Sequence, residues 1–328
     1  METTDEGGRP IMDVIGMGNP CVDLLARVNE IPVAGESASL FETSVQGGGK
    51  VATALITLGR LGARCGIVGA VGDDANGAFC IRDFARHGVD TSHLTVEKNA
   101  DTPFAIVLAD DKCHERSILY RRGHAGLDGV RNDCDYLKTA RILHLETANP
   151  WDFEAAQYAK SQGICVAFDA DHYDTKKDEL TPLIDVFIGS AHYYRTLFSS
   201  GELKDNMMAL RKRGPSVVVF TFGAQGCAVL DDDGFSIVPA YPVSVVDTTG
   251  AGDVFHGAFL YGMLQNWTSV QCAKFASAVS AIKCTKAGGR AGIPTREMVD
   301  EFMKNGVFDD RGELAQRVAQ YQQMGVVG

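Results

Sequence analysis

Residues 245–259 read VVDTTGAGDVFHGAF, and this stretch decides how the rest of the chain is interpreted. The β-branched residues at its start favour the end of a strand, and the apolar run from Val254 to Leu264 is typical of a buried helix. Gly250 and Gly252 lie at the junction, where glycine lets the backbone approach another group closely. The stretch therefore predicts a strand, a tight turn and a helix.

A turn of this kind points the free N–H groups of the first helical turn toward one place, where the helix dipole adds positive potential. That place suits an anion such as a phosphate. Asp253 puts a carboxylate beside it. The amides of Gly250, Ala251 and Gly252 would stabilise a transferring phosphoryl group while Asp253 accepts a proton from a hydroxyl. On these residues alone, an Asp that only caps the helix explains the stretch equally well.

The motif Asp-Thr-Thr-Gly-Ala-Gly-Asp, residues 247–253, resembles the signature of the ribokinase-like (PfkB) family of carbohydrate kinases. The similarity runs from about Val14 to Pro294, with the motifs in the family's order. It implies an α/β, ribokinase-like three-layer fold with a mostly parallel central sheet, helices on both faces and a small β-strand lid. The core would comprise residues 11-18, 47-100 and 125-328, the discontinuous lid 19-46 and 101-124, and a flexible tail 1-10.

The order of the elements supports this fold independently of the family. Apolar strands alternate with helical segments, which predicts a mostly parallel sheet covered on both faces. Ligands of such sheets collect at the carboxyl ends of the strands. Asp23, Glu146, Thr221 and Asp253 all fall at or near predicted strand ends.

The resemblance implies a sugar site beneath the lid. Asp23 follows Gly18 by five residues, as the family's sugar-binding Asp does, and Glu146 ends a strand that often carries a substrate-contacting Glu. Carboxylates there would accept hydrogen bonds from sugar hydroxyls. In ribose kinases an Asn stands at the position of Thr53, and this difference argues against ribose itself. The family's amino-terminal signature, a Gly-Gly turn that opens a helix, corresponds to Gly48, Gly49, Lys50 and Thr53.

Residues 120–125, YRRGHA, resemble the Tyr-Tyr-Arg-x-Gly-Ser-Ala segment of 2-keto-3-deoxygluconate kinases, in which the Arg meets the sugar acid. Arg121 would take that role and bind an anionic substituent of the substrate. A solvated basic pair on a lid explains Arg121 and Arg122 equally well.

The nucleotide site is implied by three motifs. Thr221, Gly223 and Gly226 match the family's Thr-x-Gly-x-x-Gly loop, and relatives place the adenine near Ser277. Most members carry Asn-x-x-Glu after an earlier strand, and its Glu helps position magnesium through water. This chain has Ser190 and Tyr193 there, so Ser190 is a nucleotide-binding candidate without a metal role. Relatives sometimes hold a monovalent cation with carbonyl groups, and the candidates for K⁺ are Asp247, Thr249 and Gly288.

The composition is that of an ordinary soluble globular protein, with 328 residues, 45% of them hydrophobic and 22% charged. A net charge of −11 argues against a nucleic-acid partner. No apolar run reaches the roughly 18 residues of a membrane span. The nine cysteines form no Cys-x-x-Cys pair and indicate neither a zinc site nor a disulfide framework, as expected of a cytoplasmic protein.

We therefore expect an ATP-dependent carbohydrate kinase that uses Mg²⁺ and phosphorylates a primary hydroxyl of a ketose or an anionic sugar. Relatives suggest a homodimer formed through the lid. Acceptors of the 2-keto-3-deoxygluconate, sulfofructose or nucleoside type stay open. So does a catalytically silent, kinase-like binding or regulatory subunit, which the missing Asn-x-x-Glu favours. A nicotinamide dehydrogenase is excluded, because Pro20 stands where the helix of a dinucleotide-binding turn would begin.

Overall fold

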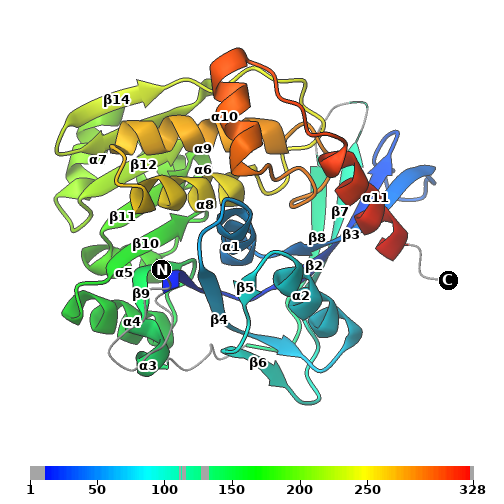
Figure 1. The fold of residues 1–328 in the computed structure, drawn as a ribbon, viewed down its shortest axis with the longest axis horizontal. Coiled ribbons are helices and arrows are strands. Elements are labelled where there is room, and N and C mark those ends of the chain that lie inside the picture. The colour runs from blue at the N-terminus through cyan, green and yellow to red at the C-terminus, as the bar shows by residue number, and fades with distance from the viewer. Residues whose placement is uncertain (1–11, 111, 113–115, 127–132, 326–328) are drawn as a thin grey trace.

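The computed structural model describes residues 12–110, 112, 116–126 and 133–325, and Figure 1 shows their arrangement. The tail predicted at residues 1–10 lies outside the described residues. Within the described ranges, no helix has both the length and the apolar character that a membrane crossing requires.

Ten strands of the described chain form one large sheet in the order β14-β13-β12-β11-β10-β9-β1-β4-β5, with β6 also paired to β4. Its pairs are parallel except β12–β13 and β13–β14, which are antiparallel. The bounds are β1 Met12–Met17, β4 Cys65–Gly72, β5 Val89–Asp90, β6 Leu94–Glu97, β9 Ala140–Leu145, β10 Cys165–Ala170, β11 Val186–Ser190, β12 Val217–Thr221, β13 Cys227–Asp231 and β14 Gly234–Val238.

Helices cover both faces of this sheet, and each face has its own hydrophobic core. One core packs α1, α2 and α8 to α11, and the other packs α3 to α7. The predicted three-layer α/β class is thereby confirmed (Figure 1). The bounds are α1 Lys50–Arg60, α2 Ala75–Arg86, α3 Cys134–Leu137, α4 Pro150–Ser161, α5 Thr175–Leu180, α6 Ala191–Leu197, α7 Leu203–Arg211, α8 Ala251–Leu264, α9 Ser269–Lys283, α10 Arg296–Asn305 and α11 Glu313–Gly325.

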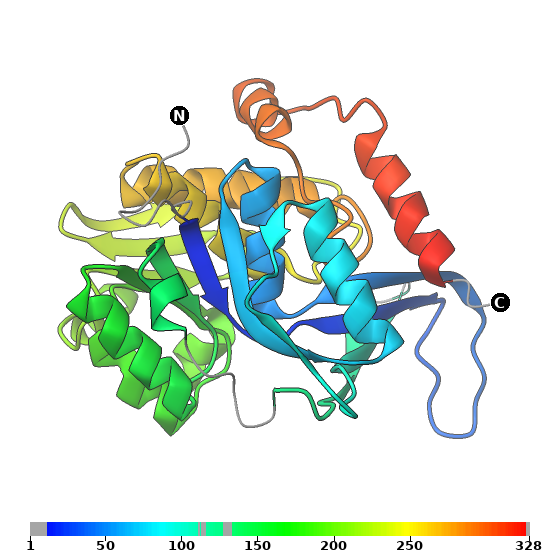
Figure 2. The same ribbon diagram turned by 60° about the horizontal axis from the view of Figure 1, so that its bottom comes forward.

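A second sheet of four strands has the order β3-β2-β7-β8. Strands β2 and β7 are parallel, and the outer pairs are antiparallel. Strands β7 and β8, which form one of these antiparallel pairs, both lie within residues 101–124. Figure 2 shows this sheet at one end of the molecule, with α11 lying along it. The bounds are β2 Cys21–Val28, β3 Leu40–Gly48, β7 Phe104–Asp110 and β8 Arg116–Arg121.

Candidate active site

The first turn of α8 is the place where the sequence predicts an anion site. Gly250 caps the helix with a φ of 72°, a left-handed conformation that favours glycine. The N–H of Ala251 donates to the carbonyl of Thr248 at 3.1 Å. Asp253 lies in this first turn and is partly exposed, whereas Val254 and the rest of the helix face the core. The amino end of α8 is therefore the part that a ligand can reach.

Asp253 lies within a group of charges. Burial, together with the charge of Asp169, raises the pKa of Asp253 to about 7, and the charge of Lys50 partly opposes this shift. Burial disfavours the charge of Lys50, but the carboxylates of Asp169, Glu146 and Asp171 raise its pKa above the usual value. Lys50 is the first residue of α1, and its charge and that of Asp253 in the first turn of α8 act on each other.

The side chain of Glu146, directly after β9, accepts hydrogen bonds from backbone N–H groups of the protein. Its Oε2 accepts the N–H of Val51 at 2.8 Å, and its Oε1 accepts the N–H of Asn19 at 3.3 Å. The carboxylate is buried, and burial raises its pKa. Glu146 therefore caps α1 and fixes the position of Lys50, a role that the sequence did not predict.

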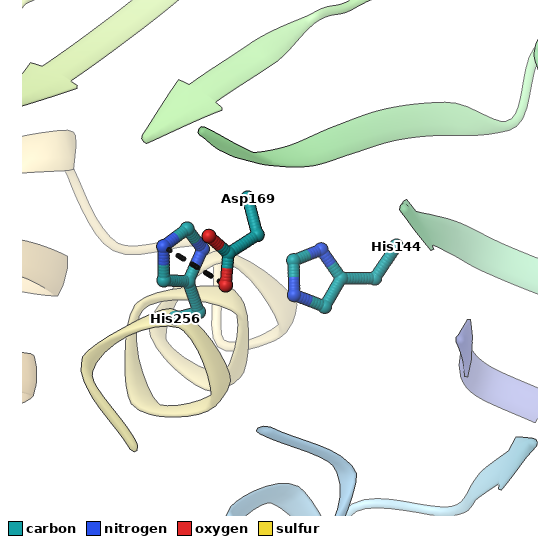
Figure 3. Close-up of side chains that lie close together, drawn as sticks. All are labelled: His144, Asp169 and His256. Carbon is teal, nitrogen blue, oxygen red and sulfur yellow. Dashed lines mark ion pairs between the residues drawn. The ribbon is translucent and has the colours of Figure 1, made fainter. Parts of the chain in front are cut away.

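Behind these charges lie His144 of β9, Asp169 of β10 and His256 of α8, all buried, with Asp169 between the two imidazoles (Figure 3). His256 Nε2 lies 3.6 Å from Asp169 Oδ2. Burial lowers the pKa of His144 to about 4 and that of His256 to about 3, so both rings are neutral at pH 7. Two imidazoles and a carboxylate are a donor set that transition metals accept. The charge of Lys50 acts on both rings, however, and would repel a further cation.

Asp23 of β2 lies beside the turn that opens α1, as predicted. A Cβ atom on Gly48 would come within 2.4 Å of Asp23 Oδ2, so glycine leaves room for this carboxylate. The thiol of Cys21 donates to Asp23 Oδ1 at 3.4 Å, and burial raises the pKa of Asp23. Gly49 caps α1 with a φ of 91°. These contacts hold Asp23 and Lys50 on the two sides of one turn.

Strand register determines which lid side chains face Asp23. Asp23 pairs with Ala105 of β7, and Ala105 pairs with Tyr120 of β8, so the three side chains lie on one face of the sheet. The charges of Asp23 and Glu146 act on the Tyr120 phenol. Arg121 points to the opposite face, is 67% exposed and forms an ion pair with Asp101. The structure thus places Arg121 away from Asp23.

Thr53 is buried, and its hydroxyl accepts a hydrogen bond from Arg290 Nε at 3.2 Å. Arg290 also donates to the carbonyl of Gly48 at 2.8 Å and to Asp83 Oδ2 at 2.7 Å. Thr53, a predicted sugar-site residue, therefore uses its hydroxyl in a hydrogen bond to the protein itself. The same arginine binds the carbonyl of Gly48, another predicted sugar-site residue.

A cavity of about 470 Å³ extends from the amino end of α8 to the loop after β12. The predicted nucleotide residues Thr221, Gly223, Gly226 and Ser277 all line it. Tyr241 and Phe255 contribute aromatic surface to its wall, and the sequence did not single them out. The remaining lining residues are Ala224, Ala240, Pro242, Val243, Val245, Thr248, Ala251, Gly252, Ser280, Ala281 and Cys284. The size and apolar wall suit a nucleotide base.

Ser190 does not line that cavity. Its hydroxyl caps α6 by accepting the N–H of Tyr193 at 3.0 Å, and it donates to the carbonyl of Asp171 at 2.7 Å. Tyr193 is fully buried in the core, so the side chain at the position of the family's Glu points away from solvent.

The three predicted cation candidates lie together. Asp247 Oδ1 accepts the N–H of Thr249 at 2.8 Å, and Asp247 Oδ2 accepts the N–H of Gly288 at 2.7 Å. This carboxylate joins the loop before α8 to the glycine-rich loop after α9.

The family model of pfkB family carbohydrate kinases matches residues 13–296. The chain belongs to this family. A nucleoside kinase of Methanothermobacter thermautotrophicus is 29% identical, covering 88% of this chain and 95% of its own. A 5-dehydro-2-deoxygluconokinase of Geobacillus kaustophilus is 28% identical, covering 89% and 94%. The solved structure of a putative ribokinase from Agrobacterium tumefaciens has a TM-score of 0.83 at 27% identity, covering 90% and 98%. This pfkB member is an ATP-dependent carbohydrate kinase.

Proposed function

We propose that this kinase transfers the γ-phosphate of ATP to a primary hydroxyl of a ketose or an anionic sugar, with Asp253 as the general base. The observation that carries the proposal is the placement of Asp253 in the first turn of α8, next to Gly252 of the cavity wall and within range of the Lys50 charge. A pKa near 7 suits a base that must take a proton at neutral pH and release it afterwards.

The residues around Asp253 divide the remaining work. The N–H groups at the amino end of α8 and the ammonium of Lys50 stabilise charge on the transferring phosphoryl group. Because the Ala251 N–H already donates to Thr248, we assign more of this work to Gly250 and Gly252. Magnesium, when bound mainly through ATP and water, would neutralise charge on the ATP phosphates.

Asp23 and the backbone of the Gly48–Gly49 turn would hold the sugar, and the four-stranded sheet would close over it as a lid. The register turns Arg121 away from Asp23, so Arg122 is the better candidate for the lid arginine that meets an anionic substituent. Arg122 comes directly after the last residue of β8, near Tyr120, whose side chain shares the face of Asp23. The charge of Arg122 also acts on the Tyr120 phenol. The apolar side chains exposed on β3 and β8 suit the expected lid-to-lid homodimer. They are Leu40, Phe41, Ile118 and Leu119.

The test is an ADP-release assay with ATP and Mg²⁺ against neutral ketoses, aldoses, nucleosides, 2-keto-3-deoxygluconate and sulfonated ketoses, with Asp253→Asn beside the wild type. Turnover of one sugar class that Asp253→Asn abolishes would support the proposal. Turnover confined to nucleosides would mean that the acceptor is a nucleoside, as the name of the Methanothermobacter relative suggests, and not a sugar. Bound ATP without turnover on any acceptor would favour the silent binding subunit.

A further inference from the structure

The loop from Asp247 to Ala251 connects the glycine-rich loop to the anion-binding end of α8, and helix α9 holds both of its ends. Ser280 Oγ donates to the carbonyl of Ala251 at 3.0 Å. Lys283 Nζ donates to the carbonyl of Asp247 at 2.9 Å. Ser280 and Lys283 are three residues apart, so they lie on the same face of α9. The geometry of the loop therefore depends on these two side chains.

Lys283 is fully buried. Burial lowers the pKa of Lys283, so an ammonium group in that position requires a compensating negative charge. Asp247 provides it: although burial disfavours its charge, Lys283 and the N–H groups of Thr249 and Gly288 hold the pKa of Asp247 below its usual value. The result is a buried cation bound to a backbone carbonyl, beside an ionised carboxylate.

Asp247 is the first of the residues that the sequence identified as candidates for K⁺, and its oxygens are already occupied. Both carboxylate oxygens of Asp247 already accept backbone N–H groups. The carbonyl of Asp247 already accepts the Lys283 ammonium. A K⁺ ion coordinated by this carbonyl would have to displace Nζ and would meet its positive charge at close range.

We propose that the Lys283 ammonium permanently takes the place of a monovalent cation at the Asp247 loop, and that this kinase needs no K⁺. The inference rests on the proposed function only in treating the loop as the phosphate-binding loop of the kinase. A tethered cation is always present, so the loop keeps its phosphate-binding geometry at any K⁺ concentration.

The experiment compares the wild type with two variants in KCl and in tetramethylammonium chloride of equal ionic strength. Lys283→Ala removes the ammonium and leaves space for an ion. Lys283→Met removes the ammonium but keeps most of the side-chain volume, and is the matched control. Each protein is assayed for turnover, and its melting temperature is measured without an acceptor.

We expect wild-type turnover and melting temperature to be the same in both salts. Lys283→Ala should lose about tenfold or more in kcat in tetramethylammonium, since a displaced phosphate-binding loop loses transition-state contacts. KCl should restore part of that loss and raise its melting temperature, because an ion that binds only the folded state stabilises it. Lys283→Met should be impaired equally in both salts.

Strong activation of the wild type by K⁺ would overturn the proposal. So would a Lys283→Ala protein whose turnover and melting temperature ignore K⁺, because Lys283 would then serve packing only. If Lys283→Ala does not fold, the wild-type comparison still decides. The melting measurements need no acceptor, so an acceptor panel without turnover would refute the proposed function and leave this test intact.

Discussion

Arg290 donates a hydrogen bond of 2.8 Å to the carbonyl of Gly48 and so connects the glycine-rich loop after α9 to the turn that we propose as part of the sugar site. The guanidinium is fully buried, and it also pairs with Asp83 Oδ2 at 2.7 Å. A Cβ atom on Gly47 would lie 1.9 Å from Arg290 NH1, so the turn and the arginine fit each other only with glycine there. Gln46 Oε1 accepts the N–H of Arg290 at 3.0 Å and strengthens the same connection.

Replacing Arg290 with Met should lower the free energy of unfolding by about 3–5 kcal/mol, because the buried Asp83 would keep the hydrogen bond from the Tyr321 hydroxyl but lose its cationic partner. Denaturant titration measures this. Lys138→Met, which removes an exposed ion pair with Asp135, is the control and should cost less than about 1 kcal/mol. Equal effects of the two variants would contradict the role of Arg290.

Asp253→Asn should reduce kcat by about 10²–10⁴-fold, the range expected when a general base is lost. Calorimetric titration should show ATP binding close to that of the wild type, since the cavity wall is unchanged. Asp205→Asn, on α7, is the matched control and should leave kcat unaltered. Near-normal turnover by Asp253→Asn would remove the residue from the mechanism.

The pH profile should show an acid limb. Asp253 must be ionised to accept a proton, so kcat/KM should fall below a midpoint near its pKa of about 7. Because the charge of Asp169 contributes to that raised pKa, Asp169→Asn should move the midpoint to lower pH. Stopped assays from pH 5 to 9 measure the profiles of the wild type and of Asp169→Asn. If both proteins have the same midpoint, the charge of Asp169 does not control the pKa of Asp253.

The same pKa predicts a stability effect. The folded state keeps the Asp253 proton up to about pH 7, whereas the unfolded chain releases it near the ordinary Asp pKa of 3.8. Ionisation of Asp253 therefore lowers stability as pH rises from about 4 to about 7. We expect Asp253→Asn to be more stable than the wild type at pH 8 and to lose this advantage at pH 4, as measured by thermal unfolding at both values.

Alanine variants of Arg121 and Arg122 should differ in their KM for the acceptor. If the acceptor is anionic, Arg122→Ala should raise its KM by about 10–100-fold, the effect of losing one charge-assisted hydrogen bond. Arg121→Ala should change KM little, because Arg121 pairs with Asp101 on the other face. The reverse order would restore the role that the sequence assigned to Arg121.

Gly226→Ala should weaken ATP binding by about tenfold or more. The alanine would strain the backbone, and its Cβ would also clash with a neighbouring strand, so the nucleotide loop would have to shift. Gly226 has a φ of 88°, and an added Cβ would lie 2.1 Å from the carbonyl oxygen of Val238. Gly234→Ala is the matched control, since Gly234 also has a positive φ but no atom within 4 Å of the added Cβ. Equal ATP affinities of the two variants would exclude a steric role for Gly226.

The sequence alone determined the layered α/β class and the anion-binding end of α8. Both follow from local rules, namely the alternation of apolar strands with helices and the backbone freedom of glycine. The sequence likewise identified Thr221, Gly223 and Gly226, which line the cavity. The spacing of glycines in a short loop can be recognised without knowing which residues pack against that loop.

Only the tertiary structure decided which side chains serve a ligand and which serve the scaffold. Thr53 is bound by Arg290, 237 residues away, and Glu146 caps α1 by binding Val51, 95 residues away. Lys283 could be read only as the last basic residue of a helix until folding placed its ammonium on the carbonyl of Asp247. Hydrogen bonds and charges act through space, so the role of a buried polar group depends on partners that the local sequence does not name.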